Sequence, residues 1–548
     1  MPAYAFKETN AETRDGILLF TRIIFPLAYR KGDKLPVVYH RTPYELPGNI
    51  APFDPVHIGR PFSDFLERGY IVVNQHCRGT GGSTGQFKNM GNERNDSLDS
   101  LDWIRKQDFY NGEIFLYGNS YKSYIHSTVL SLNPPDVKGA ALAVMPANQH
   151  YCCYEKNTFK HDLYTMWFAK TYMVNDLDIP AVYAKMREEL KKKPAVTLAE
   201  RVYGHDVPEL TEAFTHSSAD DPFWCDEATG FGQTASAPLR TNIPLLLVGG
   251  LYDIHYKGTV EYFEALPEEQ KKQSAMLMGP WTHSMNTLPE HKNIFPYSVH
   301  PPVEAEWFDS LRDIGDLNYV TKGMVTYYRP GSGWIRAAHI GDCADGELTL
   351  YPTESRTLAP EPSDGSIAFV YDPENPLSLP GGASIFQTPA RGPQPQPEPN
   401  FRQDLVSFVS DAFEKTVRVD GRVDVELNVI SDCPDTAFFV RVDAVREGIA
   451  LCLRDTIVSV SELVANYIPN TATVLRFSLD EVEWDFVRGD KLRIDVSSSN
   501  FPTYNTHSNT KEPWYLAEET RHARNTVITE GTSFTFRTVG NGSSSSGK

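Results

Sequence analysis

The chain has 548 residues, which is too long for a single hydrophobic core and predicts about three domains. Hydrophobic residues make up 41% of the chain and charged residues 22%, as in an ordinary globular protein. The formal net charge of −19 argues against nucleic acids and anionic membranes as partners, because both would repel the surface.

Cysteines and the N-terminus bear on location and cofactors. The seven cysteines are scattered without zinc or redox spacing, which favours free thiols in a reducing compartment. No basic segment followed by an apolar one opens the chain, and no run of about eighteen apolar residues interrupts it. We therefore expect a cytoplasmic protein that needs no metal and no organic cofactor.

Residues 15–145 alternate strand-like apolar runs with turns and helical segments. The expected helix is Asp96–Lys106, where Leu98, Leu101 and Ile104 share one side. The expected strands are 17–25, 35–40, 70–75, 114–117 and 137–144. This alternation predicts a mostly parallel sheet that is covered by helices on both faces.

Ser120 follows the fourth of these strands in a sharp turn and precedes a helical stretch that ends before Pro134. A strand–turn–helix context is where α/β-hydrolases place a nucleophile, because the turn lifts the hydroxyl clear of the sheet. The pattern is imperfect, since Lys122 replaces the second glycine of G-x-S-x-G. Ser120 therefore has to be judged by its partners.

Two further buried-strand patterns place polar residues directly after them. The run 242–250 leads into Asp253, and the run 274–279 opens into His283. The ends of parallel strands meet at one edge of a sheet, and the order Ser120, Asp253, His283 is that of α/β-hydrolases. The pattern predicts that Ser120 attacks a carbonyl, His283 carries its proton, and Asp253 orients the imidazole.

The patterns of helical and strand-like segments divide the chain into four kinds of region. We expect an α/β-hydrolase core in 1–146 and 239–320, with a helix near 303–313. Residues 147–238 are aromatic-rich and helical, which predicts a helical cap inserted over the site. Short strands with turn clusters over 321–540 predict an all-β sandwich of the jelly-roll type, and the Gly/Ser-rich 541–548 predicts a disordered tail. The strands of that sandwich are expected at 324–328, 347–351, 404–409, 423–431, 437–442, 474–478 and 491–498.

Several motifs together resemble the cocaine esterase-like (CocE/NonD) serine hydrolases, which are related to X-prolyl dipeptidyl aminopeptidases and α-amino-acid ester hydrolases. The resemblance covers nearly the whole chain and implies an α/β-hydrolase core, an inserted helical cap and a C-terminal jelly roll. The motifs that carry it are Arg41-Thr-Pro-Tyr44, Arg78-Gly-Thr-Gly-Gly-Ser83, Gly118-Asn-Ser-Tyr121, Gly250-Leu-Tyr-Asp253, Gly279-Pro-Trp-Thr-His283, Asp221-Pro-Phe-Trp224 and Ser497-Ser-Ser-Asn-Phe-Pro502.

The resemblance also implies site residues that the bare sequence does not reveal. It implies an oxyanion hole made by the Tyr44 hydroxyl and the backbone N–H of Tyr121. His255 stands where the family usually has an aromatic or apolar residue facing the acyl pocket, so it either binds a polar acyl group or packs behind the pocket. The aromatic residues of the insertion line an aromatic pocket or form the core of the cap; they are Trp167, Phe168 and Tyr172.

The sequence thus predicts a serine hydrolase that cleaves esters, and by the same chemistry amides, of small acyl compounds through an acyl-enzyme on Ser120. An X-prolyl dipeptidyl aminopeptidase and a β-lactam side-chain acylase remain open, since all three share one catalytic site. A different class also remains open, a carbohydrate-binding protein with an inert core. The expected partner is a small ester or amide, and jelly rolls often contribute to homodimer contacts.

Overall fold

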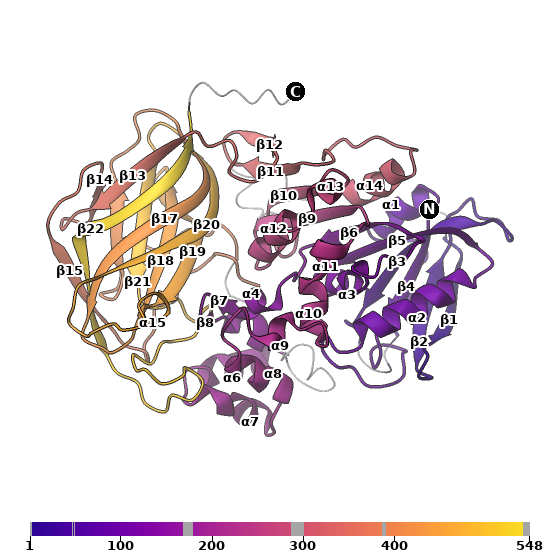
Figure 1. Cartoon of the computed structure of the whole chain (residues 1–548), viewed down its shortest axis with the longest axis horizontal. Helices are drawn as coiled ribbons and strands as arrows, with labels where there is room; N and C mark the ends of the chain where they lie inside the picture. The colour runs from indigo at the N-terminus through magenta and orange to yellow at the C-terminus, as the bar shows by residue number, and fades with distance from the viewer. Residues whose placement is uncertain are drawn as a thin grey trace.

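The computed structural model describes residues 3–45, 48, 50–167, 179–285, 301–385 and 391–540. Two large sheets lie at opposite ends of the molecule, and a mainly helical segment bridges them on one side (Figure 1). The expected tail 541–548 lies outside the described residues. No helix in the described ranges is long and apolar enough to cross a bilayer.

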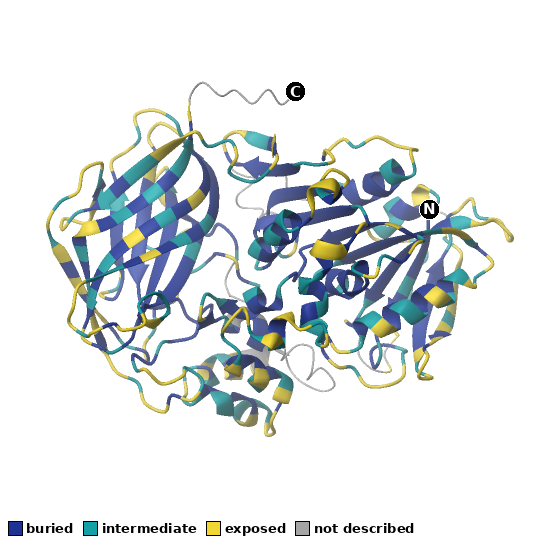
Figure 2. Ribbon diagram, in the orientation of Figure 1, coloured by how far each residue is buried: buried dark blue, intermediate teal, exposed yellow. Residues whose placement is uncertain are grey.

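The first sheet is mostly parallel. Its strand order is β1-β2-β4-β3-β5-β6-β9-β10-β11-β12, with every neighbouring pair from β4 to β11 parallel and the outer pairs antiparallel. Its strands are β1 (Phe6–Glu12), β2 (Leu18–Ile24), β3 (Leu35–Thr42), β4 (Ile71–His76), β5 (Tyr110–Asn119), β6 (Val137–Ala143), β9 (Leu245–Tyr252), β10 (Ala275–Thr282), β11 (Val325–Arg329) and β12 (Gly333–Ala337). The central strands are buried on both faces (Figure 2), which explains their continuous apolar sequences.

Helices cover both faces of this sheet. Successive residues of a strand point to opposite faces of the sheet and pack in two separate apolar clusters. On β3, for example, Val37 and Tyr39 belong to one cluster and Val38 belongs to the other. The first cluster contains apolar residues of α2 (Glu93–Arg105), α3 (Tyr121–Leu130) and α12 (Tyr256–Glu264). The second contains those of α1 (Phe62–Glu67) and α14 (Val303–Leu311). The short α13 (Glu268–Lys271) precedes β10.

A mainly helical segment is inserted between β6 and β9. It has an apolar cluster of its own, in which Leu198, Leu210 and Phe214 are buried. It also contains a small antiparallel hairpin that the sequence did not indicate, because its strands are only two residues long. The elements are α4 (Gln149–Cys153), β7 (Tyr154–Glu155), β8 (Thr158–Phe159), the π-helix His161–Thr165, α6 (Ile179–Glu189), the 3-10 turn Ala195–Thr197, α7 (Leu198–Tyr203), α8 (Pro208–Thr215), α9 (Pro222–Cys225), α10 (Gly230–Ala235) and α11 (Ala237–Arg240).

The C-terminal part is all-β apart from the single turn α15 (Val460–Leu463). Its strands follow the order β19-β18-β21-β16-β14-β13-β22-β17-β20, with β15 also paired to β22. The two end strands come together, since Arg454 of β19 donates to the Glu481 carbonyl of β20, so the sheet nearly closes on itself. The strands are β13 (Gly346–Pro352), β14 (Thr357–Ala359), β15 (Ser366–Tyr371), β16 (Val406–Ser410), β17 (Val417–Ser431), β18 (Ala437–Arg446), β19 (Ile449–Ser459), β20 (Thr473–Phe486), β21 (Lys491–Ser497) and β22 (Ala523–Val539).

One predicted strand belongs to a different sheet from the one expected. Residues 324–328 were assigned to the β sandwich, but β11 pairs in parallel with β10 and extends the first sheet. The hairpin partner β12 follows it there. The assignment was wrong because a short apolar run shows that a strand exists but not which sheet supplies its neighbour.

Candidate active site

Ser120 lies in a strained turn between β5 and α3. Its backbone has φ 56° and ψ −133°, a conformation that non-glycine residues rarely adopt. The turn is held on both sides, because the Ser120 N–H donates to the Ala143 carbonyl of β6 at 2.9 Å and its own carbonyl accepts from the Ser123 N–H and hydroxyl at 2.9 and 2.6 Å. The Ser123 side chain thus adds a hydrogen bond to the turn.

Gly118 is the glycine that the turn requires, and Lys122 stands where a second glycine is usual. A Cβ atom at position 118 would lie 2.4 Å from the backbone carbonyl of Lys122, so only glycine fits beneath the first turn of α3. Lys122 itself is an ordinary helical residue of α3. The close approach of helix to strand therefore requires one glycine, the one that the sequence keeps.

His283 bridges Ser120 and Asp253, which lie 163 and 30 residues away from it in the chain. Its Nε2 lies 2.9 Å from the Ser120 Oγ, and its Nδ1 lies 2.8 Å from Asp253 Oδ1. The three residues follow β5, β9 and β10, whose parallel ends meet at the same edge of the sheet. Asp253 is buried, and although burial raises its pKa, the neighbouring His283 lowers it further, so the carboxylate is ionised.

Tyr44 brings its hydroxyl to the same point. Hydrogen bonds link this hydroxyl to the Ser120 side chain, the Trp167 side chain and the backbone of Tyr121. Burial raises the pKa of Tyr44, although 40% of the residue remains exposed. The structure therefore places Tyr44 and the Tyr121 backbone together beside Ser120.

The Tyr121 side chain is anchored in a buried ionic network. Its hydroxyl donates to the Glu93 carboxylate at 3.1 Å and accepts the Met90 N–H at 2.8 Å. Arg41, three residues before Tyr44, contacts Glu93 at 3.2 Å and Asp96 at 3.5 Å. One network thus fixes the strand that leads to Tyr44 and the residue whose N–H faces Ser120. The sequence did not indicate Glu93, because its polar pattern is that of an ordinary helix start.

A cavity of about 40 Å³ opens beside Ser120 and His283. Trp167 and His255 both line it, and Trp167 stacks on Tyr121 with ring centroids 5.7 Å apart. Phe168 and Tyr172, which were also expected at the pocket, lie outside the described residues. Other lining residues are Met90, Pro146, Gln149, Cys152, Tyr164 and Ile385. The lining is mainly apolar with few polar groups, as in pockets for small organic groups.

His255 is an uncharged member of this lining. Its Nδ1 lies 3.3 Å from the Cys152 Sγ, and its ring meets that of His283 edge to face at 5.2 Å. Burial lowers the pKa of His255 to about 3 and raises that of the Cys152 thiol to about 12. The pair is therefore a neutral imidazole and a neutral thiol, which can exchange hydrogen bonds but carries no charge into the pocket.

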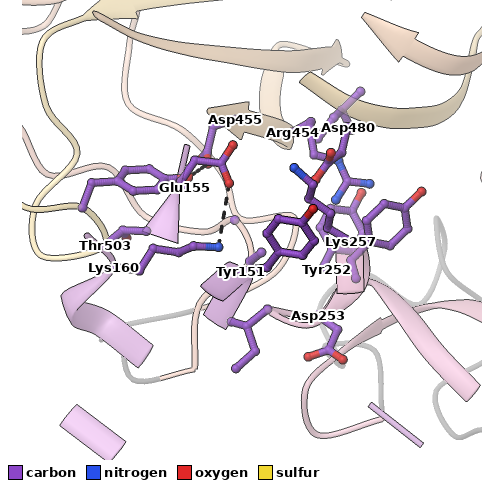
Figure 3. A pocket seen from close by; sticks show the side chains of 16 residues that line it. Tyr151, Glu155, Lys160, Tyr252, Asp253, Lys257, Arg454, Asp455, Asp480 and Thr503 are labelled. Carbon is purple, nitrogen blue, oxygen red and sulfur yellow. Dashed lines mark hydrogen bonds and ion pairs between the residues drawn. The ribbon is translucent and has the colours of Figure 1, made fainter. Parts of the chain in front are cut away.

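A second cavity, of about 60 Å³, lies on the other side of the Asp253 loop, where all three parts of the chain meet (Figure 3). Lys257 of the first part, Glu155 of the insertion and Asp480 of the β part face it. Arg454, from the same β part, donates to the Leu251 carbonyl at 2.8 Å, two residues before Asp253. The β part thus supports the strand end that leads to Asp253, a contact that sequence patterns do not reveal.

No group of three or more histidine, cysteine or carboxylate side chains in the described parts of the chain is arranged to hold a metal ion. All seven cysteines lie in these parts and are free thiols. The glycine-rich loop 78–85 is held by Arg78, which pairs with Asp15 and Asp96 at 2.6 Å.

Comparison with known proteins gives matches over both halves of the chain. Residues 15–285 match the X-Pro dipeptidyl-peptidase (S15 family) and residues 321–535 match the X-Pro dipeptidyl-peptidase C-terminal non-catalytic domain. Cocaine esterase from Rhodococcus sp. (strain MB1 Bresler) is 24% identical, with 91% of each chain covered.

Two solved structures share the fold over 98% of this chain. An α-amino acid ester hydrolase has a TM-score of 0.80 at 20% identity, with 97% of its chain covered. A CocE/NonD family hydrolase from Staphylococcus aureus has a TM-score of 0.66 at 18% identity, with 94% covered. The two family matches, which together span most of the sequence, show that the chain belongs to the family of the X-Pro dipeptidyl-peptidases (S15 family), and its similarity to cocaine esterase agrees with the expected CocE/NonD-like serine hydrolase.

Proposed function

We propose that the protein cleaves carboxylic esters of small acyl compounds, and amides by the same chemistry, through an acyl-enzyme on Ser120. The observation that carries this proposal is the continuous chain of hydrogen bonds from Asp253 through His283 to the Ser120 Oγ, at 2.8 and 2.9 Å. A hydroxyl becomes a nucleophile when an adjacent base accepts its proton, and an oriented, partly exposed imidazole supplies that base.

The steps follow from the positions of the atoms. His283 Nε2 accepts the Ser120 proton as Oγ attacks the ester carbonyl, and Asp253 stabilises the imidazolium that forms. The tetrahedral oxyanion accepts hydrogen bonds from the Tyr44 hydroxyl and the Tyr121 N–H. The imidazolium then protonates the leaving alcohol, and a water molecule activated by His283 releases the acid and restores Ser120.

The other two parts of the chain fit this function. We propose that the helical insertion acts as a cap, because Gln149, Tyr164 and Trp167 close one side of the cavity beside Ser120. We also propose that the all-β part is a jelly roll that supports the catalytic loops, since Arg454 hydrogen-bonds the strand end before Asp253. His255 and Trp167 then contact the acyl group.

Peptidase activity is the second candidate, favoured by the match to the X-Pro dipeptidyl-peptidase family. Such an enzyme has to bind a free amine, and Glu155 is a carboxylate of the insertion that lines the neighbouring cavity. Its Oε1 accepts the Thr456 hydroxyl at 2.6 Å and its Oε2 lies 3.8 Å from the Lys160 ammonium. These contacts occupy the carboxylate, which favours the ester hydrolase. The aligned hydroxyl and imidazole argue against an inert carbohydrate-binding protein.

Three measurements test the proposal. Purified protein is assayed on acyl esters, Xaa-Pro-nitroanilides and β-lactams, and a fluorophosphonate probe is used to label the nucleophile. Ser120→Ala is expected to abolish ester hydrolysis and labelling, whereas Ser131→Ala, at the end of the same helix, keeps both. Tyr44→Phe is expected to lower turnover by about 10²–10³-fold with an unchanged fold. Labelling of Ser120→Ala at the wild-type rate would contradict the mechanism.

A further inference from the structure

Among the described residues Lys122 has no counter-ion, and it lies beside Tyr44, the proposed oxyanion donor. It lies two residues after Ser120, in the first turn of α3, and its Nζ sits 5.9 Å from the centroid of the Tyr44 ring. Within the described chain no carboxylate approaches it to within 4.0 Å, and it makes no hydrogen bond through its ammonium. The ring of Tyr44 is thus an electron-rich neighbour of this ammonium.

This placement is costly for the fold. A cation at a helix N-terminus opposes the helix dipole, and an ammonium on a half-buried side chain loses part of its hydration without an ion pair to compensate. Burial accordingly lowers the pKa of Lys122 to about 8. A leucine or methionine would cover the same surface without these penalties. Residues that break a local rule without a structural benefit concentrate at functional sites.

The titratable groups around Lys122 do not neutralise it. His40 of β3 is uncharged, because burial and the Lys122 charge lower its pKa. Tyr117 of β5, stacked on His40, stays protonated because burial raises its pKa, and burial does the same to Tyr44. Glu45, in the loop after Tyr44, is directed to His76 at 3.3 Å. The positive charge of Lys122 is therefore left to act on the Tyr44 ring.

We propose that Lys122 is a positioning residue that acts through Tyr44, holding a positive charge against the phenol ring so that its hydroxyl is a stronger donor to the oxyanion. The reasoning rests on the proposed function. A cation near an aromatic face draws electron density from the ring, which makes a phenol more acidic. Tyr44 needs this help, because its burial disfavours any negative charge on its oxygen.

The active form of Lys122 is the protonated one, which sets the sign of the pH dependence. Turnover should fall on the alkaline side as the ammonium loses its proton near pH 8. Lys122→Met should lower kcat by about 3- to 30-fold with little change in KM, and should lack this alkaline fall. Lys122→Arg keeps its charge at all accessible pH, so activity should persist to higher pH than in the wild type.

The experiment compares kcat, KM and the pH profile for a neutral p-nitrophenyl ester in these variants. In a Tyr44→Phe background the Lys122→Met change should have no further effect on kcat, because the hydroxyl on which it acts is gone. The melting temperature of Lys122→Met distinguishes this role from a structural one, because the two roles predict changes of opposite sign. Lys122→Met should melt at or above the wild-type temperature, whereas a structural lysine would melt lower when replaced.

Three results would overturn the inference. The first is wild-type kcat in Lys122→Met, and the second is an equal loss with and without the Tyr44 hydroxyl. The third is an effect confined to KM for esters with anionic leaving groups, which would make Lys122 a substrate-binding cation. Rates of fluorophosphonate labelling repeat the comparison without a substrate. A wild-type protein that is not labelled at Ser120 would refute the proposed function itself, which separates the two failures.

Discussion

Arg41→Met tests whether one buried network positions both oxyanion donors. The Arg41 side chain is completely buried, with Glu93 at 3.2 Å and Asp96 at 3.5 Å. At 3.2 Å and an effective dielectric constant near 20, the attraction to Glu93 is about 5 kcal/mol, of which desolvation offsets a large part. Removing one partner of a buried pair typically costs about 3–5 kcal/mol, because the remaining charge is left without compensation.

The same change should lower turnover. Glu93 accepts the Tyr121 hydroxyl, and Arg41 lies on the strand that ends before Tyr44, so both proposed donors to the oxyanion lose support. We expect kcat to fall by about 10-fold or more. The upper limit is the fall of about 10²–10³-fold that complete loss of one donor causes. Stability is measured by urea unfolding followed by tryptophan fluorescence, and kcat with a p-nitrophenyl ester.

Arg14→Met is the matched control for this prediction. Arg14 pairs at 2.8 Å with Asp99, which lies on the same helix as Glu93, but the Arg14 side chain is 57% exposed. An exposed pair of this kind contributes about 0–1 kcal/mol, and it lies away from the active site. The reasoning is refuted if Arg41→Met costs no more stability than Arg14→Met. Wild-type kcat in a destabilised Arg41→Met would show that the network serves stability alone.

Three other changes probe the supports of the site. Arg454→Lys loses the forked contact to the Glu481 carbonyl and the hydrogen bond to the Leu251 carbonyl. The free energy of unfolding in urea should fall by about 2–4 kcal/mol, and kcat should fall because the strand end before Asp253 is released. An unchanged kcat would contradict that support. Burial, aided by the nearby Asp495, raises the pKa of Asp443 to about 8. The carboxyl therefore stays protonated in the native state up to about that pH, whereas in the unfolded chain it ionises near pH 4. The free energy of unfolding accordingly falls as the pH rises between those two values. Asp443→Asn removes that loss, so its gain in unfolding free energy should grow from pH 5 to pH 8; a pH-independent difference would count against it. Gly118→Ala places a methyl group against helix backbone 2.4 Å away, and should abolish soluble expression or labelling by fluorophosphonate; normal labelling would show that the turn can relax.

The catalytic arrangement was largely predictable because its signals are local. A buried strand followed by a tight turn specifies that Ser120 stands at a strand end, and two later strands place Asp253 and His283 likewise. Parallel strands in one sheet bring their carboxyl ends to one edge, so the chain order alone predicts convergence. The distances of 2.8 and 2.9 Å agree with that expectation.

The contributions from far along the chain were not predictable. Glu93 looks like any acidic residue at a helix start, and only packing turns it toward Arg41 and Tyr121. The same holds for Arg454, whose bond to the Asp253 strand spans 203 residues. A short apolar pattern does not specify which strand pairs with it, which is why the prediction for residues 324–328 names the wrong sheet.

The sequence by itself determined the kind of chemistry, since alternating strands and helices, a glycine-backed turn and the order of three polar residues are properties of short segments. The tertiary structure decided which charges stand beside that chemistry. A side chain such as Lys122 acquires its environment from segments that fold against it, and the field it exerts on Tyr44 depends on distance and burial, which the order of residues does not encode.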